Sequence, residues 1–344
     1  YCKWYAGTLD IYRDPKDNAP EVSYPILTSV LVTSDVSTLE WTFASESGKS
    51  FCFRALDKPS FKVWHRYFTI LNSELGGNPF DSFAPPRRNV GVSAFICGHD
   101  YYERVANIML QAESCIYISD WWLSPEIYLV RDPDVEDASQ FQLDNVLRRA
   151  AEKNVEVYIL IWKHTKVAID LGSSGCVSYL ESLHPNIRAI AHPPSFPINW
   201  SHHQKMVVVD QKIAFVGGLD LCFGRYDTTD YRLKDDNFLS LKWPGKDFYN
   251  PRLTPGNPNE PFVDGLNRRE VCRMPWQDVM LELNGPAAWD ISRNFVQRWN
   301  HHRDRKGNEL ELGPVHYPKS KGSAVVQALR SISRWSGGTK VERS

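Results

Sequence analysis

The pattern of hydrophobic positions changes near residue 75. Before it, short apolar runs alternate with turns rich in Asp, Pro, Ser and Gly, a pattern that predicts short β-strands. After Pro59 and Ser60, apolar positions recur every three or four residues, which predicts an amphipathic helix over 61–71. Residues 1–75 are therefore expected to form a small β domain that ends in a helix. The strand-like runs are 4–6, 26–32, 39–43 and 51–56.

An α/β pattern follows a short linker. Residues 76–90 carry Gly76-Gly77, Pro79 and Pro85-Pro86, a composition typical of a linker. Beyond it, helical stretches alternate with nearly continuous apolar runs, and this alternation predicts an α/β sheet covered on both faces. The predicted helices are 100–112, 142–153, 177–183 and one around 295–299. The predicted strands are 115–119, 155–162, 187–191, 205–209 and 213–216.

Segment 243–276 interrupts this alternation. It holds six prolines, so it predicts a long loop, and loops of this length without their own secondary structure are usually functional or disordered. Its aromatic residues favour an ordered loop. We therefore expect it to cover an active site. The aromatic residues are Trp243, Phe248, Tyr249, Phe262 and Trp276.

Composition excludes several classes of protein. With 42% hydrophobic and 24% charged residues, the 344-residue chain is typical of a packed protein. Its net charge of −1 argues against nucleic acid as a partner. Seven cysteines without close C-x-x-C pairs indicate neither a disulfide scaffold nor a zinc site, and the odd number favours a cytoplasmic location. No run approaches the roughly 20 apolar residues of a membrane span, and a chain that starts at Tyr1 is expected to be a fragment.

The strongest chemical signal lies in residues 200–220. His203 and Lys205 stand two residues apart at the head of a predicted strand, so their side chains share one face. An imidazole can attack phosphorus while an ammonium neutralises the phosphate oxygens. Asp210 falls at the following turn, where it can hold the His-Lys strand in place. The pair Gly217-Gly218 permits a close backbone approach, which a bound phosphate would use.

This H-x-K-x-x-x-x-D signature, followed by Gly217-Gly218-Leu219-Asp220, resembles the phospholipase D superfamily. Flanking segments over about residues 80–340 are similar to eukaryotic, phosphatidylcholine-hydrolysing members. They are Asp120-Trp-Trp-Leu-Ser-Pro-Glu-Ile, Leu183-His-Pro-Asn-Ile, Gly224-Arg-Tyr-Asp, the segments 243–252 and 273–278, and Phe295-Val-Gln-Arg-Trp-Asn.

The resemblance implies a fold and a reaction. Residues 91–344 would form the first catalytic lobe, an α-β-α sandwich, and residues 1–75 the end of a pleckstrin-homology-like barrel. The enzyme would hydrolyse phosphatidylcholine to phosphatidic acid and choline through a phosphohistidine, with transfer to alcohols as a side reaction. It would need no cofactor and no metal, and would be cytoplasmic and peripheral on membranes.

The resemblance also implies roles for single residues. His203, Lys205 and Asp210 would be catalytic, and the expected substrate-binding residues are Gly217, Gly218, Asp220, Trp121 and Trp122. The tryptophans could form a wall for a choline-like head group or pack in the core, and the sequence leaves both open. His202 should point to the other face of the strand and pack.

Members of this superfamily combine two such motifs, one from each lobe. This sequence holds no second copy, since His301-His302-Arg303-Asp304 has the wrong spacing. We therefore expect half an active site, inactive alone, whose partner is a C-terminal lobe of the same polypeptide.

Two alternatives stay open. One is another phosphodiesterase of the superfamily, such as a nuclease completed by dimerisation. The other is a non-catalytic module that binds phosphoinositides. From Arg298 onward the chain holds ten Lys and Arg against four Asp and Glu, a bias that would attract an anionic membrane surface.

Overall fold

The computed structural model describes residues 2–5, 8–11, 13–14, 16, 22–24, 29–45, 50–74, 83–163, 173–192, 201–235, 242–250, 260–264, 266–302, 310–312 and 322–337. The chain divides into two compact units. The first comprises Tyr1–Arg87, Gly313–Val315 and Val325–Ser344, and the second comprises Arg88–Leu312 and His316–Ala324.

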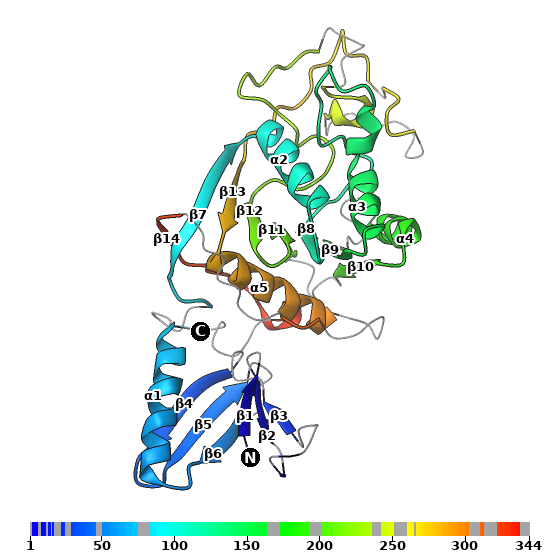
Figure 1. The fold of residues 1–344 in the computed structure, drawn as a ribbon. Coiled ribbons are helices and arrows are strands. Elements are labelled where there is room, and N and C mark those ends of the chain that lie inside the picture. Colours follow the sequence, from blue (N-terminus) through cyan, green and yellow to red (C-terminus); the bar gives the residue numbers. More distant parts are fainter. Residues whose placement is uncertain are drawn as a thin grey trace. The chain divides into compact units, whose positions relative to one another are not determined.

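The first unit contains two antiparallel sheets and a helix (Figure 1). Four aromatic side chains, Trp41, Phe43, Phe61 and Phe68, form its core, in which the rings of Trp41 and Phe61 stack with centroids 4.5 Å apart. One sheet has the order β1-β2-β3 and the other β4-β5-β6. The elements are β1 (Cys2–Tyr5), β2 (Thr8–Ile11), β3 (Val22–Tyr24), β4 (Ser29–Asp35), β5 (Glu40–Ser45), β6 (Ser50–Arg54) and α1 (Lys58–Glu74).

The predicted helix is confirmed and is longer than expected. It begins at Lys58, where the carboxylate of Asp57 accepts a hydrogen bond from the N–H of Ser60 at 2.7 Å and so satisfies a free donor of the first turn. Strands β5 and β6 confirm two of the predicted runs, whereas β2 and β3 were not predicted. Residues 26–28, part of a third run, lie outside the described residues. The pleckstrin-homology assignment stays a prediction.

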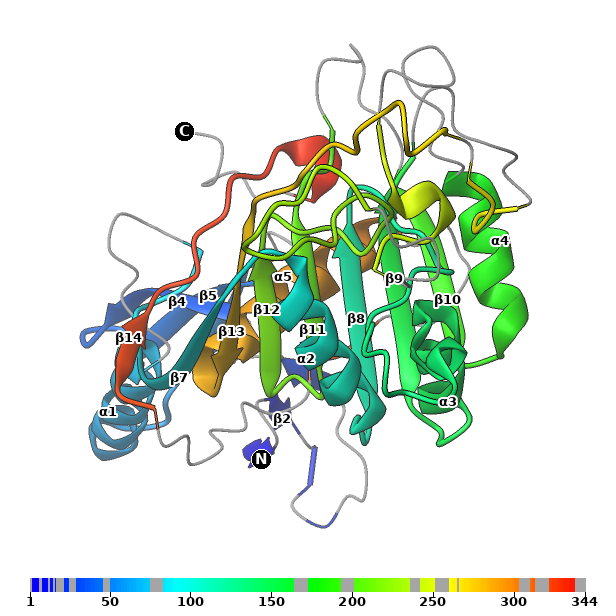
Figure 2. The ribbon, with the colours of Figure 1, turned by 90° about the horizontal axis from the view of Figure 1, so that it is seen from above.

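The second unit is built around a mixed sheet with the order β10-β9-β8-β11-β12-β13-β7. Strands β8, β9 and β10 run parallel, and every later pair, from β8-β11 to β13-β7, is antiparallel. Helices α2 and α3 lie on one face and α5 on the other (Figure 2). The strands are β7 (Arg87–Ile96), β8 (Cys115–Asp120), β9 (Glu156–Trp162), β10 (Ile187–His192), β11 (Lys205–Val209), β12 (Ile213–Gly217) and β13 (Val279–Asn284). The helices are α2 (Gly98–Leu110), α3 (Leu143–Ala151), α4 (Ser173–Leu183) and α5 (Pro286–His302).

Side chains on both faces of this sheet are buried. All six residues of β8 and all five of β11 are buried, as expected for strands that pack on both sides. The predicted α/β class is therefore confirmed. The remaining elements are the 3₁₀ turns η3 (Ala138–Phe141), η4 (Gly245–Asp247) and η5 (Arg334–Ser336), and β14 (Ala324–Val326), which straddles the division between the units.

One segment differs from the sequence analysis and another agrees with it. Strand β7 begins at Arg87, inside the segment 76–90 expected to be a linker, of which 76–82 lie outside the described residues. Within 243–276, the described residues include no helix or strand other than η4, and Trp243 and Phe248 are buried. Residues 251–259 and 265 of that loop lie outside the described part.

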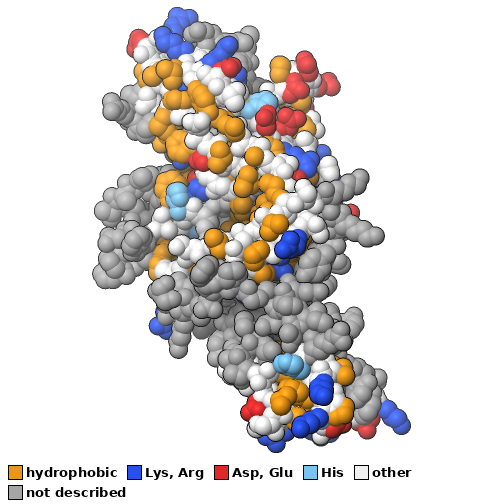
Figure 3. Space-filling model, turned by 90° about the vertical axis from the view of Figure 1, so that its left-hand side faces the viewer, with side chains coloured by type: hydrophobic (Ala, Val, Ile, Leu, Met, Phe, Trp, Pro, Cys, Tyr) orange, Lys and Arg blue, Asp and Glu red, His pale blue; other side chains and the backbone are white. Residues whose placement is uncertain are grey.

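Part of the sheet keeps an uncovered apolar face. Val279 of β13 lies opposite Ile96 of β7, and their side chains are 54% and 53% exposed. Val92 and Leu281 are exposed as well. Figure 3 shows the face seen from the left-hand side of Figure 1, with hydrophobic side chains exposed at several places on it. No helix among the described residues is both long enough and apolar enough to cross a membrane.

Candidate functional site

The candidate site lies where the parallel strands end and β11 begins. Because β11 runs antiparallel to β8, its first residues lie beside the last residues of β8, and Met206 is paired with Ser119. Lys205 therefore meets the segment that leaves β8, with its Nζ 5.7 Å from the ring centroid of Trp121. Ligands of α/β sheets commonly bind at this edge, beyond the carboxyl ends of the parallel strands.

A buried ion pair fixes Lys205. Its Nζ lies 3.1 Å from Oδ1 of Asp220, and the two side chains are only 4% and 3% exposed. The same Oδ1 accepts hydrogen bonds from the N–H groups of Trp121 at 2.8 Å and Trp122 at 3.2 Å. Asp220 therefore joins the start of β11 to the end of β8. The ion pair therefore holds the ammonium in place before any ligand arrives.

His203 is exposed beside this pair. Its ring lies 5.6 Å from that of Trp121. Partial burial and the charge of Lys205 lower the pKa of His203 below its usual value. The imidazole is therefore neutral near pH 7, the state in which a ring nitrogen has a free electron pair for attack on phosphorus.

Asp210 lies away from this group. It follows the last residue of β11, whereas Lys205 is the first. Its carboxylate accepts hydrogen bonds from the N–H groups of Glu113, Ser114 and Cys115 at 2.7–3.2 Å. Asp210 thus anchors the turn after β11 to the residues that open β8, in agreement with the predicted role of holding the strand. A direct part in the reaction stays a prediction.

Removing this anchor should cost stability. Asp210→Ala leaves three N–H groups without their acceptor and places alanine at a positive φ of 53°. We expect a loss of about 2–4 kcal/mol in the free energy of unfolding, measured in urea. Asp210→Asn is the matched control, because asparagine keeps one acceptor oxygen and tolerates this φ; it should cost less. Equal losses in the two variants would contradict the anchoring role.

Close packing explains why positions 217 and 218 are glycines. A Cβ at Gly217 would collide with the carbonyl of Val279 and with Met280 on β13, and one at Gly218 would collide with the carboxylate of Asp278. The sequence analysis expected a phosphate to lie close to these glycines. The atoms that lie close to them are instead those of β13 and of the Asp278 carboxylate. Substrate contact at Gly217 and Gly218 stays a prediction.

Trp121 and Trp122 are each partly buried and differ in their surroundings. Trp121 faces His203 and Lys205, whereas Trp122 contacts the ring of Tyr249 at 5.9 Å and packs against the core. Of the two, Trp121 is the one that lies within reach of a ligand at His203.

Several polar residues of the site were not predicted. Burial and the charge of Asp220 raise the pKa of Asp120 well above its usual value, and its carboxyl accepts the N–H of Leu221 at 3.0 Å. Asp220 is the carboxylate that pairs with Lys205. Asp278 and Arg225 both act electrostatically on His203. They come from separate loops, so no sequence spacing indicates that they meet.

His202 points away from the site, as predicted. It is 2% exposed, its Nε2 lies 3.0 Å from Oγ of Ser119, and its ring stacks on His192. The ring of His192 in turn lies 4.0 Å from that of His302. Burial, together with neighbouring cationic groups, lowers the pKa of His202 well below its usual value and that of His302 to about 2.

This histidine stack makes stability depend on pH. An unfolded histidine titrates near pH 6.5, so below that pH the unfolded state binds more protons than the folded state, and acid favours unfolding. From pH 7.5 to 5.0, we expect a loss of roughly 2 kcal/mol for each histidine that stays neutral. Urea unfolding at the two pH values measures this loss in the free energy of unfolding. His302→Phe should make the dependence shallower, and an unchanged slope would rule out its contribution.

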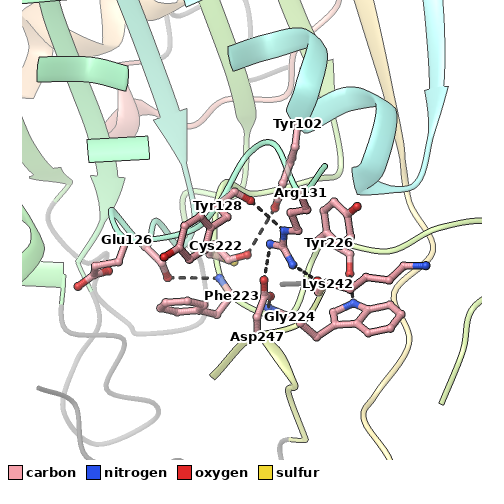
Figure 4. A network of polar contacts seen from close by, with 12 residues as sticks. Tyr102, Glu126, Tyr128, Arg131, Cys222, Phe223, Gly224, Tyr226, Lys242 and Asp247 are labelled. Carbon is pink, nitrogen blue, oxygen red and sulfur yellow. Dashed lines mark hydrogen bonds and ion pairs between the residues drawn. The ribbon is translucent and has the colours of Figure 1, made fainter. Parts of the chain in front are cut away.

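A buried network fastens the start of the loop 243–276 to the second unit. Arg131 lies at its centre, where its guanidinium pairs with the carboxylate of Asp247 and covers the ring of Tyr226 at 3.7 Å (Figure 4). It also donates to the carbonyls of Tyr128 and Lys242. Asp247 in addition accepts the N–H of Gly224 at 2.6 Å.

A second buried pair holds the end of the same loop. The guanidinium of Arg273 lies 2.5 Å from Oδ1 of Asp227 and 4.0 Å from the ring centroid of Trp243. The other oxygen of Asp227 accepts the N–H of Trp276 at 2.8 Å. Both ends of the loop are thus tied to the segment 224–227, which follows the strand after the His-Lys motif.

Comparison with known proteins gives a consistent match. The family model "Phospholipase D" matches residues 108–342. Phospholipase D A of Dictyostelium discoideum is 44% identical over 266 residues, which are 76% of this chain and 20% of that protein. Phospholipase D2 of Bos taurus is 37% identical over 299 residues, 75% of this chain and 32% of that protein. Phospholipase D1 of Saccharomyces cerevisiae is 37% identical over 286 residues, 76% of this chain and 17% of that protein. The chain therefore spans less than a third of the length of these relatives.

Among the described residues, no three His, Cys, Asp or Glu side chains gather as a metal ion would require.

Proposed function

The chain belongs to the phospholipase D family, and on that basis we propose that it supplies one half of the active site of an enzyme that hydrolyses phosphatidylcholine. The observation that carries the proposal is the exposed, neutral His203 beside a buried Lys205 that is ion-paired with Asp220. A nucleophile next to a fixed cation suits attack on a phosphodiester.

In the first step, a ring nitrogen of His203 attacks phosphorus, and the bond from phosphorus to the choline oxygen breaks. Negative charge on the phosphate oxygens grows as the nitrogen approaches, and Lys205 stabilises it. Because Asp220 fixes the ammonium beforehand, little reorganisation is needed when the charge develops. The product is a phosphohistidine that carries the diacylglycerol part of the lipid.

The departing oxygen needs a proton from the side opposite His203. An in-line displacement places nucleophile and leaving group on opposite sides of phosphorus, so one histidine cannot serve both. The sequence has no second H-x-K-x-x-x-x-D motif. We propose that a histidine of a second lobe of the same protein donates this proton and then accepts one from water, which releases phosphatidic acid. An alcohol in place of water would give a new phosphodiester.

The test is capture of the intermediate. The full-length protein is mixed with phosphatidylcholine vesicles that carry ³²P and is quenched in base, in which phosphohistidine survives. We expect a labelled peptide that contains His203 and loses its label in acid. Rapid choline release without label on that peptide would overturn the assignment of the nucleophile.

A second test concerns the division of the site. We expect the 344-residue chain alone to release no choline from phosphatidylcholine vesicles, and the second lobe added in trans to restore release. Robust hydrolysis by the chain alone would favour a homodimeric phosphodiesterase.

We further propose that the enzyme works at membrane surfaces from the cytoplasmic side. The basic bias after Arg298 favours an anionic leaflet, and a pleckstrin-homology-like first unit would add phosphoinositide binding. Binding to vesicles that contain phosphatidylserine should weaken as salt rises from 50 to 500 mM, because salt screens exposed charges. Binding unaffected by salt would leave the basic stretch without this role.

A further inference from the structure

Arg225 is buried and has no carboxylate partner among the described residues. It follows β12, and only 6% of its surface is exposed. Its Nε and Nη1 atoms are fully buried and have no hydrogen-bond partner among the residues that the structure describes. Its guanidinium instead contacts two indoles, with Cζ 3.7 Å from a ring centroid of Trp276 and 5.5 Å from that of Trp122.

Three other buried arginines of the same unit differ from Arg225 in this respect. Each of them has at least one aspartate as a partner, so within the described residues a carboxylate is the usual counter-ion for a buried guanidinium here. Asp227, only two residues beyond Arg225, is already bound to Arg273. The pairs are Arg131 with Asp247, Arg268 with Asp235 and Asp264, and Arg273 with Asp227.

A guanidinium cannot lose its charge in a protein, so Arg225 stays cationic. Burial of an unpaired charge costs desolvation free energy, and contact with aromatic faces offsets only part of this cost. An anion bound to Arg225 would offset more of it. The arrangement is therefore that of a binding site for a negative group.

Arg225 is connected to the candidate nucleophile. Trp122, whose ring contacts Arg225, donates its N–H to the Asp220 carboxylate that holds Lys205. After burial and Lys205, Arg225 is a further cause of the lowered pKa of His203. Arg225 and Lys205 are thus two cationic groups that act electrostatically on one imidazole.

We propose that Arg225 is a substrate-binding residue that contacts the phosphate oxygens of the phospholipid held at His203. The inference rests on the proposed function for the identity of this phosphate. A guanidinium presents its N–H groups as a planar fork that matches two phosphate oxygens, whereas Lys205 presents one compact charge. Stacking on Trp276 and Trp122 fixes the plane of the guanidinium, so little side-chain entropy is lost when a phosphate binds.

The experiment measures anion binding separately from turnover. Inorganic phosphate is titrated calorimetrically into the full-length protein carrying His203→Asn, so that the proposed nucleophile is absent. We expect Arg225→Gln in this background to weaken phosphate binding by about 10- to 100-fold. Arg232→Gln, a change of an exposed arginine seven residues further on, is the matched control and should leave the affinity unchanged.

Unchanged phosphate affinity in a folded Arg225→Gln variant would overturn the proposal. Should that variant fail to fold, Arg225→Lys decides, because lysine keeps the charge but not the fork. We expect it to lose roughly three- to tenfold in affinity, and wild-type affinity would likewise overturn the proposal. In the otherwise wild-type protein, Arg225→Lys should raise KM for short-chain phosphatidylcholine more than it lowers kcat.

The two proposals fail in distinguishable ways. Phosphate binding that depends on Arg225, in a full-length protein without any turnover of phospholipid, would refute the proposed function and leave the anion site standing. Turnover of phospholipid together with a phosphate affinity that does not depend on Arg225 would refute the anion site and leave the proposed function standing.

Discussion

Replacing His203 with asparagine in the full-length protein should reduce the hydrolysis of phosphatidylcholine to below ~1% of the wild-type rate, since the amide cannot attack phosphorus. Asparagine is polar and smaller than histidine, and position 203 is exposed, so the fold should be retained. Choline release measures the rate, and circular dichroism with thermal unfolding checks the fold. A folded variant that keeps more than a few per cent of the rate would show that another group is the nucleophile.

A histidine-to-asparagine substitution far from the site, at His184, serves as the control. His184 precedes β10, at the amino ends of the parallel strands, whereas the site lies at their carboxyl ends. His184→Asn should therefore leave choline release near the wild-type rate. A large loss in this variant as well would point to a general effect of the substitution and not to the chemistry of His203.

Arg131→Met should destabilise the second unit by about 3–5 kcal/mol, because it leaves Asp247 buried without its cation. The side chains of Arg131 and Asp247 are 0% and 1% exposed, so water cannot replace the lost partner. Urea unfolding followed by tryptophan fluorescence would measure the loss. The double variant Arg131→Met/Asp247→Asn removes both charges and keeps the oxygen that accepts the N–H of Gly224. It should be more stable than Arg131→Met.

A more exposed ion pair provides the comparison. Arg188 and Glu156 are paired with side chains 37% and 39% exposed, and pairs in contact with water contribute little. Arg188→Met should cost less than about 1 kcal/mol. Similar losses for Arg131→Met and Arg188→Met would contradict the view that burial determines the effect.

Local spacing was enough to predict the part of the site that lies in and directly around β11. Residues two apart in a strand share a face, so the sequence predicted that His203 and Lys205 lie on one side and that His202 points away. The turn at Asp210 followed from its position between two apolar runs. These features depend on neighbours in the chain, and the structure agrees with them.

The rest of the site depends on contacts between distant segments. Arg225 and Asp278 act on His203 from the loop after β12 and from the residue before β13, and Asp120 acts on Asp220 from the end of β8; no periodicity relates them. Asp278 fills the space at Gly218, which sequence reasoning assigned to a phosphate. Strands β7 and β13 were missed for a related reason: several of their apolar residues are exposed, so neither forms a clear buried run.

The pairing of β7 with β13 has a consequence for biosynthesis. The two strands are neighbours in the sheet, yet Ile96 and its partner Val279 are about 180 residues apart in the chain. At translation rates of roughly 5–20 residues per second, β7 leaves the ribosome about 10–40 seconds before its partner. During that interval the emerging strand exposes unpaired N–H and C=O groups, which chaperones that bind extended apolar segments would recognise.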